Sequence, residues 1–323
     1  MRGGLRRWRQ WLGRAALAAG LAGAGAPAVA QAVPGAPASG LPAAAADTLA
    51  TAPLDTVASD PLAVRQKLFD AVRLINRYKD SEALATYQDV LKISPAHYLA
   101  LWQAAVLSVK IGARYSDETR KAAYFDAATR YADRALVVRP EGGESNYAAA
   151  LALFSQASLY RSENRLAAFR DLRSYVFLAV AQRPDLPEAW QLLGRWQYRV
   201  GHYNVLERLY SKLLLGGVPP GGSVPDAMRS LETALRLDST RATFYYDLAR
   251  MYRYQGRRRR AVALLQKAVR LPTFTSEDLT INRLCQQLLE PLQRATTRGA
   301  RRQLRIRQRA AASAGAPPAV PAP

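Results

Sequence analysis

The chain has 323 residues, of which 22% are charged, and a net charge of +21 at pH 7. This length can hold one or two domains. The charge indicates attraction to anionic partners such as nucleic acid, a membrane surface or an acidic peptide. An alternative stays open, in which arginine serves only as a solvated surface cation. The single cysteine, Cys285, excludes an internal disulfide and a thiolate metal cluster.

Residues 1–30 have the layout of a signal peptide. A basic start precedes an apolar tract of Ala, Gly and Leu at residues 15–26, and Ala28-Val29-Ala30 matches a signal-peptidase site before Gln31. The tract is shorter than the ~20 residues that span a bilayer. We therefore expect export and a periplasmic or secreted protein. Arg6-Arg7 leaves the Sec and twin-arginine routes both open, and a merely disordered leader is the alternative.

The rest of the chain divides by composition into a linker, a helical body and a tail. Residues 31–59 are rich in Ala and Pro and predict a disordered linker. From 60 to 292, apolar residues recur at helical spacing and no strand pattern occurs. We expect an all-α domain of about five helix hairpins, closed by a capping helix. The predicted units cover about 60–95, 96–140, 144–184, 187–239 and 240–272, with the cap at 275–292 and a basic, then Ala/Pro-rich disordered tail at 293–323.

The hairpins follow a repeat. Ala227 and Ala261 are 34 residues apart, and each lies in the second helix of its predicted hairpin. Tyr245-x2-Leu248-Ala249-x2-Tyr252 has the residue order of a first helix in the tetratricopeptide repeat (TPR). The chain thus resembles a TPR-like right-handed superhelical solenoid. Its expected repeat markers, which are packing residues, are Trp102, Trp190, Leu193, Gly194, Tyr245, Leu248, Ala249, Tyr252 and Ala261. We expect an insertion near residues 113–119, and an extra helix with a glycine loop between Gly201 and Val224.

A closer resemblance rests on four segments of the C-terminal half. These are Leu193-Gly194-Arg195-Trp196-Gln197-Tyr198, the Pro-rich insertion before Asp226-Ala227, Ala234-Leu235-Arg236-Leu237-Asp238, and Val269-Arg270-Leu271-Pro272 followed by Thr275-x2-Asp278. Together they resemble the regulator of microtubule dynamics family over Pro187 to Leu292. That resemblance implies a TPR-like architecture, an association with microtubules and, in some members, with organelle contacts.

Polar residues on the first helices of the last two hairpins are the candidate partner site, because such helices line the groove of a TPR solenoid. Arginines interleaved with tyrosines suit carboxylate or phosphate groups and offer stacking surfaces. We expect them to bind an anionic or C-terminal peptide segment of another protein; the alternative is an ordinary solvated helix face. The predicted groove residues are Gln191, Arg195, Tyr198, Arg199, Tyr246, Arg250, Arg253 and Tyr254.

Three functional hypotheses remain open. The first is an exported, non-enzymatic TPR scaffold or adaptor. The second is a regulator-of-microtubule-dynamics-like protein that attaches to a filament or an anionic surface; the basic tail, with Arg301 to Arg309, could contact the cell envelope. The third is an enzyme with a pocket in the insertion at 201–224. No catalytic residue, cofactor or metal site is predicted, since His97 and His202 lack ligand spacing. No module for specific nucleic-acid recognition is recognisable.

Overall fold

The computed structural model describes residues 61–314, and within them it contains twelve α-helices and no strand. The expected signal peptide at 1–30, the linker at 31–59 and the last residues, 315–323, lie outside the described residues. None of the helices in residues 61–314 combines the length and the apolar character that crossing a bilayer requires.

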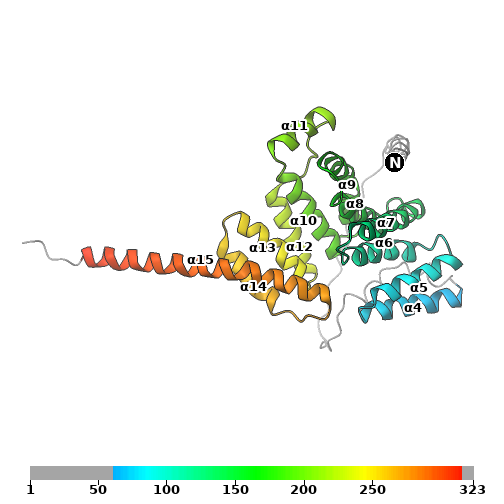
Figure 1. Cartoon of the computed structure of the whole chain (residues 1–323), viewed down its shortest axis with the longest axis horizontal. Coiled ribbons are helices and arrows are strands. Elements are labelled where there is room, and N and C mark those ends of the chain that lie inside the picture. The colour runs from blue at the N-terminus through cyan, green and yellow to red at the C-terminus, as the bar shows by residue number, and fades with distance from the viewer. Residues whose placement is uncertain (1–60, 315–323) are drawn as a thin grey trace, which may run out of the picture. The chain divides into compact units, whose positions relative to one another are not determined.

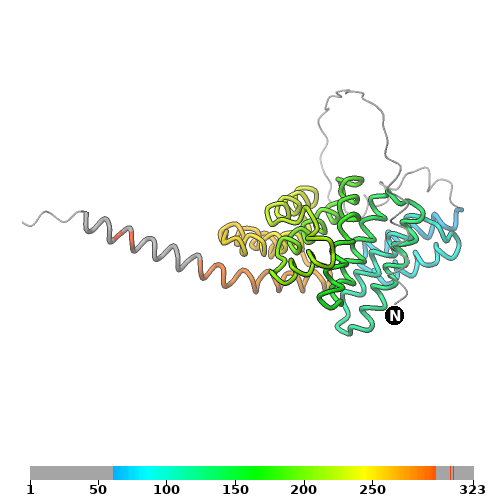
Figure 2. Tube along the Cα trace, turned by 90° about the horizontal axis from the view of Figure 1, so that it is seen from above, coloured from blue at the N-terminus to red at the C-terminus, as the bar shows by residue number. Residues whose placement is uncertain are grey.

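Successive helices pack in pairs, and each pair packs on the next in chain order (Figure 1). The tube seen from above shows the same progression (Figure 2). This architecture confirms the predicted all-α, TPR-like fold. The pairs are α4 (Leu62–Asn76) with α5 (Asp80–Ile93), α6 (Tyr98–Gly112) with α7 (Glu118–Val138), α8 (Gly143–Ala157) with α9 (Ser162–Gln182), α10 (Pro187–Gly201) with α12 (Val224–Leu237), and α13 (Ala242–Tyr254) with α14 (Arg258–Val269). Two helices lie outside these pairs: α11 (Val205–Leu214) lies between α10 and α12 in the chain, and α15 (Ser276–Ala314) packs on α13 and α14.

Small residues let paired helices approach closely. At Gly194, an added Cβ would lie 2.9 Å from Leu231 Cγ and 3.0 Å from the backbone oxygen of Ala227, so α10 and α12 meet where no larger residue fits. The other repeat markers are buried, except Trp190, which is half-buried and donates its Nε1–H to the carbonyl of Pro184 at 2.8 Å. The marker positions are therefore packing contacts of the stack.

The two insertions take different forms. Near residues 113–119 the extra length lies mainly in α7, which has 21 residues and is capped by the side chain of Asp117. Between Gly201 and Val224 the chain forms α11, which starts with a capping box of Asn204 and Glu207. A loop with three glycines at positive φ then leads to α12.

The last helix is longer than the sequence analysis expects. The predicted cap ends at 292 and a disordered tail follows, whereas α15 continues through Pro291 to Ala314. Proline removes one backbone donor and crowds the carbonyl four residues earlier, but the residues after it are mostly Ala, Arg, Gln and Leu, which are strong helix formers. The first part of α15 packs on the stack through Cys285, Leu288 and Leu292.

Candidate functional site

The predicted groove residues, apart from Arg199, share one surface on two neighbouring helices, which we term the α10–α13 face. Gln191, Arg195 and Tyr198 belong to α10, and Tyr246, Arg250, Arg253 and Tyr254 belong to α13. The two helices pack against each other although α11 and α12 separate them in the chain. Tyr198 of α10 and Tyr254 of α13 are neighbours on this face, with ring centroids 6.1 Å apart.

Asp247 lies at the centre of this face. Its Oδ2 atom accepts hydrogen bonds from Arg195 Nε at 2.6 Å and from Gln191 Nε2 at 2.8 Å. The carboxylate side chain is 7% exposed and that of Arg195 is 38% exposed. A buried carboxylate needs such donors, because an unpaired charge away from water is costly. The charge of Arg195 is thus neutralised within the protein, by an acid that the sequence analysis did not single out.

Arg199 is engaged on another side of α10. Its Nη1 donates to Glu207 Oε2 at 3.2 Å, its Nη2 also ion-pairs with Glu207, and its guanidinium lies over the rings of Phe169 and Tyr203 at 5.8 and 5.1 Å. The hydrogen bond from Arg199 lowers the pKa of Glu207, so this carboxylate stays ionised. Arg199 therefore anchors the start of α11, and the structure does not join it to Arg250.

Three aromatic rings form the open end of the α10–α13 face. The ring centroids of Tyr198 and His202 lie 4.0 Å apart, and those of His202 and Tyr254 lie 4.3 Å apart. The Nδ1 atom of His202 lies 2.8 Å from the carbonyl oxygen of Tyr198. Burial raises the pKa of the Tyr198 hydroxyl, and the positive charge of Arg250 opposes that rise. The sequence analysis placed His202 at a helix edge and missed that it joins two groove tyrosines.

Arg250 and Arg253 are the open cations of this face. Both are exposed, and no ion pair to either is recorded among residues 61–314. Arg250 lies over the ring of Tyr246 at 5.6 Å. The face therefore presents two uncompensated guanidinium groups beside three tyrosines and one histidine. Guanidinium groups with free donors can hold a carboxylate or phosphate, and the rings offer stacking surfaces.

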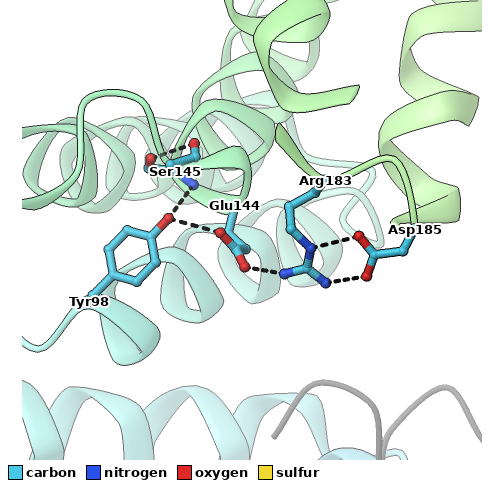
Figure 3. Close-up of polar contacts among 6 residues, drawn as sticks. Tyr98, Glu144, Ser145, Arg183 and Asp185 are labelled. Atoms are coloured by element: carbon cyan, nitrogen blue, oxygen red, sulfur yellow. Dashed lines mark hydrogen bonds and ion pairs between the residues drawn. The ribbon is translucent and has the colours of Figure 1, made fainter. Parts of the chain in front are cut away.

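A second polar cluster, shown in Figure 3, joins three parts of the stack. Tyr98 on α6 donates its hydroxyl to Glu144 Oε2 at 3.1 Å and accepts the backbone N–H of Ser145 at 3.1 Å. Glu144 on α8 ion-pairs with Arg183 (Figure 3). The Arg183 guanidinium also donates two hydrogen bonds to the Asp185 carboxylate, at 2.9 and 2.8 Å. We term this set the Arg183 cluster. Its charged groups pair with one another, so the cluster connects the start of α6, the start of α8 and the end of α9.

Electrostatics of the Arg183 cluster agree with that role. Burial raises the pKa of the Tyr98 hydroxyl to about 12, so it remains a donor. The hydrogen bond from Arg183 lowers the pKa of Asp185. The Arg139 guanidinium lies over the Tyr98 ring, 4.6 Å from its centre. None of these residues was singled out from the sequence, because the cluster assembles from separate segments. Tyr98 and Glu144 are 46 residues apart, and Glu144 and Arg183 are 39 residues apart.

Three observations bear on the enzyme hypothesis. Burial raises the pKa of the Cys285 thiol to about 11, which keeps it protonated and poorly nucleophilic. Within residues 61–314, no group of three or more His, Cys, Asp or Glu side chains is placed to hold a metal ion. An open cavity of 660 Å³ is lined by residues of α12, α13 and α14, among them Tyr252 and Arg260, and by none from the insertion at 201–224.

Comparison with known proteins identifies the family. The model of the family described as regulator of microtubule dynamics protein 1-3 matches residues 68–293. The chain belongs to this family. The match begins in α4 and ends in α15, and so extends well before the C-terminal half on which the resemblance in the sequence rests. It contains both the Arg183 cluster and the α10–α13 face.

Two mammalian relatives and one bacterial structure give the scale of the similarity. Regulator of microtubule dynamics protein 3 of Bos taurus is 30% identical over 128 residues, which are 39% of this chain and 27% of the relative. The same protein of Rattus norvegicus is 26% identical over 190 residues, 58% of this chain and 40% of the relative. The chain thus matches less than half the length of these relatives. A thermophilic TPR protein of Thermus thermophilus superposes with a TM-score of 0.50 and 19% identity, over 70% of this chain and 98% of that one, which shows the fold alone.

Proposed function

We propose that this protein is a non-enzymatic scaffold that binds an acidic peptide segment of another protein on the α10–α13 face. Stacked TPR-like hairpins are a protein-interaction architecture. The observation that carries the proposal is the pair Arg250 and Arg253, both exposed and without an ion pair among residues 61–314, beside the Tyr198–His202–Tyr254 rings. An acidic or C-terminal carboxylate would supply the missing charge.

The strength expected of such a site follows from its two open cations. Arg195 adds little, because Asp247 already neutralises it. A charge-assisted hydrogen bond to a carboxylate contributes roughly 1.5–3 kcal/mol when the groups are partly desolvated. Two such contacts with ring stacking correspond to a weak, salt-sensitive site, suited to a ligand that carries several carboxylates.

Binding of fluorescein-labelled hexaglutamate to the full chain, followed by anisotropy, tests this site. Changing Arg250 and Arg253 to Glu should weaken binding at least about tenfold, since two attractive contacts become repulsive. The matched control changes Arg77, exposed just after the end of α4, and Arg130, exposed on α7, to Glu and gives the same change in net charge. Equal losses in both variants would show that the overall charge, rather than this face, binds the peptide.

Export is part of the same proposal and is supported by the sequence of residues 1–31 alone. The mature protein would start at Gln31 and act in the periplasm or outside the cell. N-terminal sequencing of protein expressed in a bacterium checks this. An intact Met1 in the mature pool would contradict it.

Family membership favours one second candidate, attachment to a filament or an anionic surface. The matched relatives are named as regulators of microtubule dynamics. Co-sedimentation of the full chain with polymerised tubulin tests the filament. If the variant with Arg250 and Arg253 changed to Glu no longer pellets with the filament, the filament binds the α10–α13 face. If the variant pellets as well as the unmodified chain, another basic surface makes the contact.

A further inference from the structure

The inserted helix α11 turns an apolar surface to the outside. Five of its ten residues are large apolar side chains with high exposure: Val205 81%, Leu206 75%, Leu209 52%, Leu213 70% and Leu214 67%. Figure 1 shows α11 at the upper edge of the described helices, beyond the end of α10. Single exposed leucines are common on proteins, but a contiguous exposed apolar patch marks an interaction surface.

Four of these side chains form one stripe, and Leu214 lies outside it. At 3.6 residues per turn, Val205, Leu209, Leu213 and Leu206 fall within an arc roughly 100° wide, which is the width of an apolar helix face that normally packs inward. The inward face of α11 carries two polar residues beside the half-buried ring of Tyr210. Glu207 and Ser211 lie inward, where Glu207 pairs with Arg199 and Ser211 is buried.

α11 is held in this orientation by specific contacts. The capping box of Asn204 and Glu207 fixes its start. Past its end, Arg170 Nη1 on α9 donates to the carbonyl of Leu215 at 3.1 Å, and Arg173 Nε donates to that of Pro220 at 2.9 Å. The apolar stripe thus faces outward because both ends of the insertion are anchored.

The surroundings of the stripe are cationic. Arg208 and Lys212 lie on α11 itself, and both are exposed. The acids nearby are already paired, Glu207 with Arg199 and Asp171 with Arg170. An apolar stripe flanked by uncompensated basic side chains is the pattern of a helix that lies in the interface of an anionic membrane.

We propose that α11 docks this protein on an anionic lipid bilayer, with its leucines among the upper acyl chains and its basic side chains at the lipid phosphates. A helix of ten residues is about 15 Å long and cannot offer the ~800 Å² per partner of a stable protein interface. A bilayer needs no matching groove, and its negative charge complements Arg208 and Lys212. This attachment goes beyond the scaffold function and uses a different surface from the α10–α13 face.

Flotation of the full chain with phosphatidylglycerol-containing vesicles, compared with vesicles of phosphatidylcholine alone, tests the docking. We expect binding to the anionic vesicles, and a reduction of at least about tenfold when Leu206 and Leu213 are changed to Ser, since two inserted side chains are lost. The matched control changes Val137 and Val138, exposed on α7, to Ser and should leave binding unchanged. Equal binding of the leucine variant and the unmodified protein would overturn the proposal.

A fluorescent reporter locates the contact independently of other basic segments. An environment-sensitive dye is attached to Leu209→Cys or, as the control, Val137→Cys; the buried Cys285 stays unlabelled in the native protein. Anionic vesicles should shift the emission to the blue only at position 209. A blue shift at neither position overturns the proposal. A second result would also overturn the proposal: changing Leu206 and Leu213 to Ser turns a dimer into a monomer but leaves vesicle binding intact. In that case α11 joins two copies of the chain.

Discussion

The Arg183 cluster and the α10–α13 face both consist of arginine, acidic and tyrosine side chains, but they differ in how many acids pair with each arginine. Arg183 meets two carboxylates, and the side chains of Arg183 and Glu144 are only 17% and 13% exposed. On the α10–α13 face, Arg195 has one buried acid, Asp247, whereas Arg250 has a tyrosine ring and no recorded ion pair among residues 61–314. The three arginines thus form a series with two, one and no acidic partners.

This series separates structural from available charge. An arginine whose donors are filled by its own chain holds helix ends together and has little left for a ligand. An exposed arginine without an acid adds little to stability, because water already solvates it. We therefore expect the effect of removing each arginine on stability to fall along the series, and the effect on ligand binding to rise.

The largest loss of stability should follow Arg183→Ala. The substitution leaves Glu144 and Asp185 without their shared cation, and Glu144 is largely out of water. Removing one partner of a buried pair costs about 3–5 kcal/mol, and partial exposure here lowers the expected loss to about 2–4 kcal/mol. Urea unfolding followed by circular dichroism measures it. Arg183→Lys, which keeps the charge but not the two-pronged grip, should lose less; equal losses in both would show that charge is not what matters.

Asp133 is the reverse case, a half-buried carboxylate on α7 for which no ion pair is recorded in residues 61–314. Burial raises its pKa to about 6, whereas an unfolded chain has a value near 3.9. The folded state therefore binds more protons between these values, and stability falls as the pH rises from about 4 through 6. Asp133→Asn should stabilise the protein by about 1–2 kcal/mol at pH 7 and by little at pH 4. Unfolding curves at both pH values check this, and an equal gain at both would exclude titration as the cause.

The sequence predicted the helices better than their polar contacts. Periodic apolar residues and the Pro and Gly breaks located the paired helices and the extra helix at α11, because these signals act over a few residues. Arg195 and its partner Asp247 are 52 residues apart, and no local pattern indicates which acid reaches which arginine. Periodicity placed Arg199 in the groove by the same rule as Arg195, but Glu207 on the inserted helix binds it instead. Insertions outside the repeat bring partners that a repeat cannot predict.

Arg195 tests the middle of the series. Arg195→Ala should cost about 1 kcal/mol, less than Arg183→Ala, because Arg195 is 38% exposed and Gln191 still donates to Asp247. A double-mutant cycle with Asp247→Asn isolates the pair, and we expect a coupling energy of about 0.5–1.5 kcal/mol. Additive effects would mean that the contact between Arg195 and Asp247 adds nothing to the free energy of unfolding. Arg195 would then behave like an arginine without an acidic partner.

Arg250 should give the smallest change. Arg250→Ala removes an exposed guanidinium that lies 5.6 Å over the ring of Tyr246 and that has no recorded ion pair in residues 61–314. Surface substitutions of this kind change the free energy of unfolding by less than about 0.5 kcal/mol. Arg250→Glu should be equally well tolerated, because a chain with a net charge of +21 gains from losing a positive charge. Urea unfolding gives the free energy of unfolding of both variants, and the hexaglutamate assay gives their affinity for the peptide. Weaker peptide binding at unchanged stability would make Arg250 a ligand contact, whereas a stability loss above about 1 kcal/mol would show that it supports the fold as Arg183 does.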